Sequence, residues 1–187
     1  MKKLLLVLMM CFSTQIYALE VEGVKLNDAL QLDKHAVVLS GTGLRTKFFI
    51  KVYVAALYLD EKRYSAAAVF ENTGAKRMLF HMLRDVSGKQ MLDAINDVLP
   101  ANHNSEEMKA LEARLNDFTK LFASVNELKK NQEVAFDYIP GVGTRILIDG
   151  IEKGKFEGAD FYTAMLKVWL GEKPAQGDMK RTLLGGK

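Results

Sequence analysis

Apolar positions in the first part of the chain follow the two-residue period of β-strands. Short apolar segments over 20–26 and 36–39 predict two strands. Between residues 48 and 59 only Lys51 interrupts a run rich in valine, tyrosine and phenylalanine, which is typical of a strand covered on both faces. Over 76–83 two sets of apolar side chains alternate, so this segment predicts a further strand.

The apolar spacing then changes to the three and four residues of amphipathic helices. Ser87 and Gln90 form a capping box, in which each side chain satisfies a free backbone N–H, and Pro100 ends the helix that follows. A second helix begins near Asn104 or Ser105 and carries an apolar stripe to about residue 125.

Strand-like segments return in the last third of the chain, separated by turn signals. The five residues of 139–143 include a Pro-Gly pair, and Asp149-Gly150 is a typical two-residue hairpin loop. The remaining predicted elements are strands over 133–138, 144–148 and 151–156 and helices over 160–170 and 178–184. Strands, two helices, more strands and a closing helix indicate an α+β fold with an antiparallel sheet.

The N-terminus carries the three parts of a secretory signal peptide. Lys2 and Lys3 are followed by an apolar stretch over 4–12, and cleavage behind Ala18 is expected. The stretch is shorter than the roughly 20 apolar residues of a membrane-spanning helix. We therefore expect residues 1–18 to be removed, with residues 19–187 forming a single exported domain in the periplasm that keeps no stable membrane anchor.

The composition argues against several kinds of site in this domain. The one cysteine of the chain, Cys11, lies in the predicted signal peptide, so neither a disulfide nor a thiolate metal site is expected. The full chain has a formal charge of +3, and loss of Lys2 and Lys3 leaves a nearly neutral domain without the basic footprint of a nucleic-acid binder. The three histidines are far apart in sequence, so neither a metal site nor a cofactor is expected.

Two residues stand out as candidates for ligand binding. Arg45 follows a glycine-rich turn expected at 41–43, and Tyr53 lies within the most apolar stretch of the domain. A guanidinium beside an apolar surface recognises a carboxylate through two parallel charge-assisted hydrogen bonds, and a phenol can add a third donor. The structural alternative is that Arg45 caps a turn or pairs with an acid while Tyr53 fills the core.

Several segments resemble the chalcone isomerase-like family, in particular its bacterial exported branch. They are GTGLR at 41–45, FFIKVYVAALYL at 48–59, PGVGTRILIDG at 140–150 and FEGADFYTAMLKVWLGEKP at 156–174. The resemblance implies a curled antiparallel β-sheet packed against a layer of α-helices, with an apolar cleft between them. In the plant enzymes of this family a flavanone forms in the cleft, and related non-catalytic members bind fatty acids.

The resemblance also implies roles for individual residues. Arg45 matches the family arginine, and Tyr53 falls where the fatty-acid binders carry a tyrosine and the enzymes a threonine. Met91 and Val98 fall where the enzymes carry a tyrosine and an asparagine, and neither side chain can orient a ketone or a water by hydrogen bonding. This pattern favours binding over turnover, so no catalytic residue is predicted.

A shared site for Arg45 and Tyr53 requires the chain to turn between them. A fully extended segment of eight residues would separate their α-carbons by roughly 26 Å. We therefore expect a bend, bulge or turn near Thr46 and Lys47. Without such a turn, Lys47 or Lys51 would supply the charge instead.

Three hypotheses follow. The first is non-catalytic binding of fatty acids or similar apolar carboxylates, with the head group held by Arg45 and Tyr53. The second is an intramolecular lyase, an isomerase of the chalcone–flavanone type that uses Arg45. The third is a periplasmic scaffold or interaction protein whose cleft is filled by side chains, with Trp169 in a helix that mediates contacts; the residues alone favour a core position for Trp169.

Overall fold

The computed structural model describes residues 18–186, in which strands precede and follow the helical segment α2–α3 (88–124) and two helices close the chain. The strands are β1 (Ala18–Val21), β2 (Val24–Asn27), β3 (Ala29–Leu32), β4 (His35–Lys47), β5 (Ile50–Leu59), β6 (Lys76–Met82), β7 (Val86–Ser87), β8 (Glu127–Leu128), β9 (Glu133–Ile139), β10 (Gly143–Ile148) and β11 (Ile151–Phe156). The helices are α1 (Ala66–Glu71), α2 (Gly88–Asn96), the 3-10 helix η1 (Leu99–Asn102), α3 (Ser105–Ser124), α4 (Ala159–Leu170) and α5 (Gly177–Leu183). The predicted signal peptide lies outside the described residues except for Ala18, the first residue of β1.

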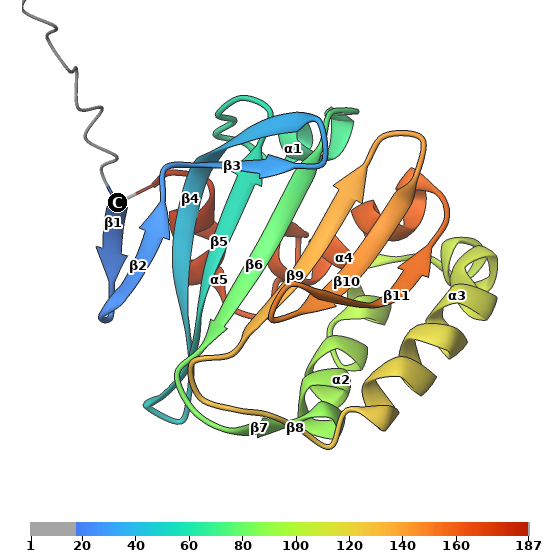
Figure 1. Cartoon of the computed structure of the whole chain (residues 1–187). Helices are drawn as coiled ribbons and strands as arrows, with labels where there is room; N and C mark the ends of the chain where they lie inside the picture. Colours follow the sequence, from blue (N-terminus) through green and yellow to red (C-terminus); the bar gives the residue numbers. More distant parts are fainter. Residues whose placement is uncertain (1–17, 187) are drawn as a thin grey trace, which may run out of the picture.

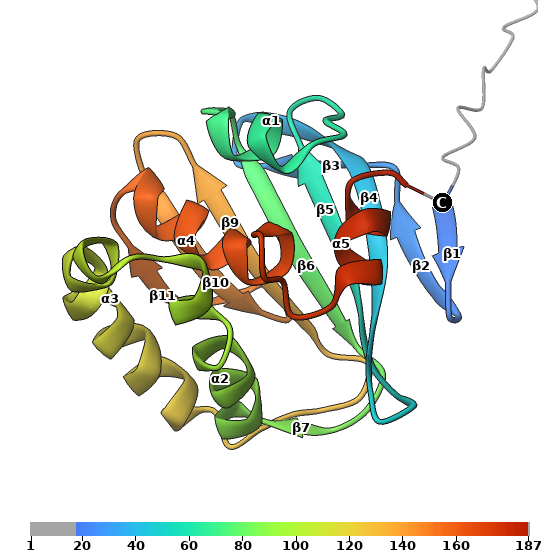
Figure 2. The same cartoon turned by 180° about the vertical axis from the view of Figure 1, so that it is seen from behind.

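Seven strands form one curled antiparallel sheet in the order β11-β10-β9-β6-β5-β4-β3. Figure 1 shows this sheet in front of the helices, and Figure 2, from behind, shows α2, α3, α4 and α5 along its other side. The predicted α+β class, a curled antiparallel sheet packed against helices, is confirmed. None of the helices within residues 18–186 is long and apolar enough to span a membrane.

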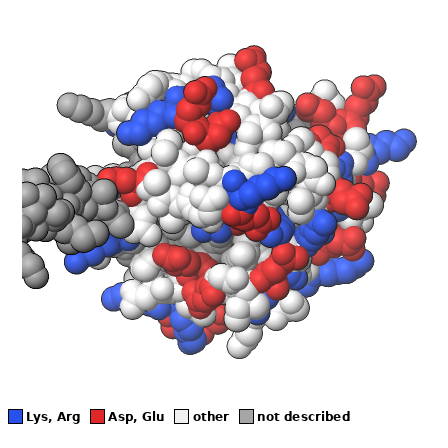
Figure 3. Space-filling model, turned by 45° about the horizontal axis from the view of Figure 1, so that its top comes forward, with Lys and Arg blue, Asp and Glu red and all other residues white. Residues whose placement is uncertain are grey.

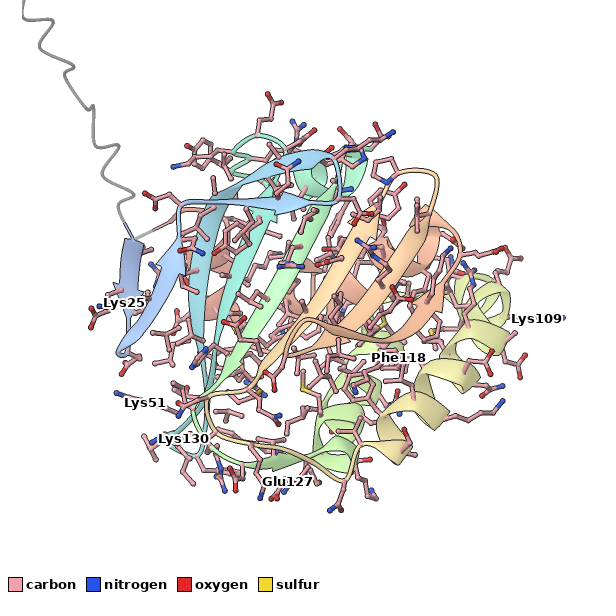
Figure 4. All side chains as sticks on the ribbon, viewed as in Figure 1. Lys25, Lys51, Lys109, Phe118, Glu127 and Lys130 are labelled. Carbon is pink, nitrogen blue, oxygen red and sulfur yellow. The ribbon has the colours of Figure 1, made fainter. Side chains whose placement is uncertain are left out.

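The two faces of the sheet carry separate apolar clusters because successive side chains of a strand point to opposite sides. On β6, Met78 and Phe80 join the cluster under the helices, whereas Leu79 joins the cluster on the other face. Phe118, labelled in Figure 4, belongs to α3, and its ring centroid lies 5.9 Å from that of Phe136 on β9. From Tyr53 to Leu59 the strand β5 is buried on both faces, as its continuous apolar run predicts.

The glycine-rich turn expected at 41–43 is wrong, because these residues continue β4. A Cβ added to Gly41 would lie 2.2 Å from the backbone oxygen of Leu183, and one on Gly43 would lie 2.6 Å from Cγ of Met179. Both contacts come from α5. The glycines therefore let this helix pack directly against the strand.

The bend, bulge or turn expected near Thr46 and Lys47 is confirmed by a bulge between Arg45 and Thr46, and the chain then reverses direction at Phe48 and Phe49. Both have positive φ angles, 49° and 65°, so β5 begins only at Ile50. The first predicted strand, 20–26, is in fact a hairpin of β1 and β2. The helix α1 was not predicted. The side chain of Ser65 caps its start by accepting a hydrogen bond from the backbone N–H of Ala68.

One face of the molecule shows no separation of charged residues by sign. On the face shown in Figure 3, Lys and Arg are interspersed with Asp and Glu. One ion pair joins β6 and β9: Arg77 Nε and Nη2 each donate to one carboxylate oxygen of Asp137 at 2.6 Å. The side chain of Asp137 is only 1% exposed and that of Arg77 is 20% exposed, so the carboxylate is buried and the guanidinium partly buried.

Candidate ligand-binding site

A cavity of about 250 Å³ lies where the β4–β5 hairpin meets α2 and α4. Its wall is formed by the hairpin, the segment around Arg84, one face of α2, the end of α4 and Ala175. Most of the lining side chains are apolar, among them Val52, Val86, Met91, Ile95, Val168 and Trp169. The cleft between sheet and helices is therefore open at this end.

Arg45 and Tyr53 both line this cavity and are direct cross-strand partners. Opposite residues of antiparallel strands have Cβ atoms about 4.5–5.5 Å apart on the same face of the sheet. The turn at residues 48–49 replaces the extended path that would have separated them. A bulge between Arg45 and Thr46 makes Val52 an extra residue on β5, and bulges of this kind re-aim neighbouring side chains.

The guanidinium of Arg45 is held by oxygens on one side only. Its Nη1 donates to the backbone oxygen of Ala175 at 3.0 Å, to Oε1 of Gln176 at 3.2 Å and to the backbone oxygen of Thr46 at 3.3 Å. No carboxylate of residues 18–186 forms an ion pair with it, and its Nε and Nη2 donate no hydrogen bond within that range. Two donors of a half-buried cation thus stay available to a ligand.

Gln176 fixes the position of this guanidinium, and sequence reasoning missed it. Its Oε1 accepts from Arg45 and from the backbone N–H of Thr46 at 3.0 Å, while its Nε2 donates to the backbone oxygen of Leu44 at 3.1 Å. Gln176 immediately precedes α5, so the side chain joins that helix to β4. No local signal in the sequence indicates a contact over 131 positions.

Tyr53 offers a buried hydroxyl group with an unused proton. Its oxygen accepts a hydrogen bond from Nε1 of Trp169 at 2.9 Å, and no oxygen or nitrogen of the described chain accepts its proton. Burial raises the pKa of Tyr53, against the lowering effects of the Trp169 hydrogen bond and the Arg45 charge. The phenol is therefore neutral at physiological pH and available as a donor.

Trp169 occupies the core position expected for it and also forms part of the site. Its ring lies 4.7 Å from that of Phe80, and its side chain lines the cavity. The indole N–H holds the hydroxyl of Tyr53 in place. This second role could not be predicted, because it requires α4 to lie across β5.

The charged groups around the cavity include cations beyond Arg45. Lys47 and Arg84 line it and have no ion-pair partner among residues 18–186. Lys51, the other cation considered from sequence, does not line the cavity and pairs with Glu22 at 2.5 Å. Of the two candidate replacements for Arg45, only Lys47 therefore lies at the cavity.

The residues matched to enzyme positions make no polar contribution here. Met91 lines the cavity from α2, whereas Val98 packs against the core outside it. Asp93 and Asp97 also line the cavity, and Asp93 is paired with Lys89 at 2.7 Å. Among the described residues no group of three potential metal ligands is found.

Comparison with known proteins identifies the family and the fold of the chain. A model of chalcone isomerase-like proteins matches residues 18–185. The chain belongs to the chalcone isomerase-like family. Among solved structures, the crystal structure of an Arabidopsis thaliana fatty-acid binding protein matches with a TM-score of 0.64 and 16% sequence identity, covering 87% of this chain and 92% of that one.

At this identity the match shows a shared chalcone isomerase-like fold. No curated protein sequence matches the chain. The resemblance stated from the sequence is thus confirmed for the family and for its fold.

Proposed function

We propose that this chalcone isomerase-like protein binds fatty acids or similar apolar carboxylates without catalysis. The observation that carries the proposal is the pairing of Arg45 and Tyr53 across two strands at one apolar cavity. Together they present three hydrogen-bond donors that the described residues leave unused. A carboxylate is the anion whose two oxygens suit this set of donors.

The head group is bound by Nε and Nη2 of Arg45, the edge of the guanidinium that makes no other hydrogen bond. Such planar, paired contacts are shorter and about twice as strong as neutral hydrogen bonds. The hydroxyl of Tyr53 adds a third donor while Trp169 holds its oxygen. The cation is already oriented by Ala175 and Gln176, so little side-chain entropy is lost on binding.

The apolar lining accepts the hydrocarbon tail. Each buried methylene contributes about 0.8 kcal/mol, or roughly a fourfold gain in affinity. The cavity of about 250 Å³ is slightly below the range of about 300–1,000 Å³ typical of small-molecule sites. Affinity should therefore rise with chain length and level off once the tail passes the mouth of the cavity.

The alternatives fit less well. An isomerase of the chalcone–flavanone type needs polar groups to orient its substrate, and Met91 presents a thioether to the cavity instead. A scaffold with a filled cleft implies no space beside Arg45, contrary to the cavity found there. The fold shared with a fatty-acid binding protein of Arabidopsis thaliana adds support to the first hypothesis.

Calorimetric titration with saturated fatty acids of increasing length tests the proposal. Arg45→Met should weaken binding by about 10- to 100-fold, because it removes a charge-assisted pair worth roughly 1.5–3 kcal/mol. Arg145→Met is the matched control, since Arg145 pairs with Asp33 and does not line the cavity. Equal affinity of Arg45→Met and the unchanged protein would exclude the proposed head-group site.

Two further measurements distinguish the competing hypotheses. If Arg84→Met weakens binding as much as Arg45→Met, the cavity attracts anions by general charge and not through a defined clamp. Ring closure of a chalcone above the background rate, lost in Arg45→Met, would favour the isomerase.

We further propose that the protein is exported to the periplasm, on the strength of the predicted signal peptide at 1–18. Fractionation of the producing cells and N-terminal sequencing should find a periplasmic protein that begins at Leu19. A cytosolic protein that keeps its first residues would contradict this.

A further inference from the structure

The tip of the β4–β5 hairpin exposes two aromatic rings. Phe48 is 84% exposed and Phe49 102% exposed, while Ile50 beside them is 48% exposed. Most other large apolar side chains of the described residues are buried in the two clusters. Two adjacent phenylalanines that protein atoms leave almost wholly uncovered expose apolar surface to water at a cost in free energy.

The backbone at this tip is unfavourable as well. Both central residues of the two-residue loop have positive φ, the arrangement for which asparagine and glycine are strongly preferred. A bulky residue in this region costs about 1–2 kcal/mol. In the free protein, burial of Phe48 and Phe49 does not offset this strain. The two phenylalanines at the tip therefore do not stabilise the fold.

The tip adjoins the mouth of the cavity. Phe48 and Ile50 line the cavity, and so does Lys47 from the same hairpin. Figure 4 labels Lys51 and Lys130 at this end of the molecule. The side chains of Lys47, Arg84 and Lys130 form no ion pair within the described chain, in contrast to that of Lys51, which is bound to Glu22.

Two of the acidic groups at this end already have basic or backbone partners. Asp85 accepts a hydrogen bond from the backbone N–H of Lys130 at 2.8 Å and lies 3.3 Å from Nζ of Lys129. Asp93 is paired with Lys89. Asp97, which lines the cavity, has no such partner among the described residues, so unpaired cations outnumber unpaired acids around the tip.

We propose that Phe48 and Phe49 insert into the surface of an anionic lipid bilayer, so that the hairpin brings the mouth of the cavity against the membrane. Exposed aromatic rings beside Lys and Arg are the combination that binds lipid interfaces. The contact lets a fatty acid pass between the bilayer and the cavity. This role of the contact rests on the proposed function.

The size of the tip favours lipid over a protein partner. Two phenylalanine rings offer roughly 150–250 Å² each, whereas a stable protein interface takes about 800 Å² from each side. A bilayer requires no complementary shape, and its anionic head groups complement Lys47, Arg84 and Lys130.

Flotation with vesicles of phosphatidylcholine containing about one third phosphatidylglycerol tests the proposal on protein purified from the producing cells. Phe49→Gly should lower the vesicle partition coefficient roughly tenfold, because it removes the transfer free energy of one aromatic ring that is partly buried in the bilayer. Because glycine relieves the positive φ, the same variant should also melt at a higher temperature. The matched control is Ile151→Ser, which removes an exposed apolar side chain (61%) from the β10–β11 hairpin.

A local probe gives a second readout. In Phe49→Trp the new indole should be quenched by brominated lipids, whereas in Ile151→Trp it should not. Unchanged flotation of Phe49→Gly, an equal loss of flotation in Ile151→Ser, or no quenching of Phe49→Trp would overturn the membrane contact. A complex with another protein that needs Phe49, without flotation, would equally reject lipid as the partner.

Failure of this inference and failure of the proposed function are distinguishable. Phe49 does not line the cavity, so Phe49→Gly should bind fatty acids normally in vesicle-free solution. Arg45→Met should lose fatty-acid binding and still float with vesicles. The two variants therefore test the two ideas separately.

Discussion

Replacing Gly41 by alanine tests how the fold positions the ligand site. Gly41 is on β4, at the point where α5 crosses the strand. A Cβ there would meet the backbone oxygen of Leu183 at 2.2 Å, its carbonyl carbon at 2.6 Å and the backbone oxygen of Thr182 at 2.7 Å. All three atoms belong to the helix backbone, so no side-chain rotation relieves the clash, and α5 itself must move.

The magnitude follows from the overlap. Ordinary contacts of a Cβ begin at about 3.4 Å, so the helix has to withdraw by about an ångström. Overpacking of this kind costs typically 1–3 kcal/mol. For a domain of this size that corresponds to a fall of roughly 3–10 °C in Tm. Because Gln176 at the start of α5 holds the guanidinium of Arg45, fatty-acid affinity should fall too, although Gly41 does not line the cavity.

Thermal unfolding followed by circular dichroism, with calorimetric titration of a fatty acid, measures both effects. Gly177→Ala is the matched control, since Gly177 begins α5 and a Cβ there would meet nothing within 4 Å. That variant should be neutral or slightly stabilising. If Gly41→Ala kept both its Tm and its ligand affinity, the close approach of α5 would not position Arg45 as argued.

Further predictions concern buried polar groups. Tyr53→Phe leaves the indole N–H of Trp169 without its acceptor and should cost about 1–3 kcal/mol in urea unfolding; a double-mutant cycle with Trp169→Phe that shows no coupling would contradict it. Asp137→Ala leaves the partly buried guanidinium of Arg77 without its carboxylate partner and should cost about 3–5 kcal/mol, whereas a loss below 1 kcal/mol would mean that water replaces the carboxylate. Burial lowers the pKa of Lys76 to about 8, so between about pH 8 and 10 the unfolded chain holds more protons and unfolding free energy should rise by up to about 1.4 kcal/mol per pH unit. In Lys76→Met that rise should be absent, and a parallel pH profile of the two proteins would refute the assignment.

The candidate site shows where sequence reasoning reaches its limit. Arg45 and Tyr53 were found from their residue types and from the family resemblance, and both line the cavity. Gln176 and the second role of Trp169 were missed, because their contacts join positions 131 and 116 residues apart. The bend, bulge or turn expected near Thr46 and Lys47 is present as a bulge. The hairpin tip was taken as part of a strand, because phenylalanines at positive φ carry no turn signal.

The chain's own pattern determined the fold class, four of the helices and most of the long strands. Capping at Ser87, the apolar stripes of the helices and the alternation along β6 act between neighbours in sequence, so they can be recognised without a fold. Only the tertiary structure decided that Arg45 faces Tyr53, that glycines in β4 serve helix packing, and that a cavity remains beside them. These features depend on strand register, on a bulge and on the docking of α5, each of which is set by the packing of segments far apart in the chain.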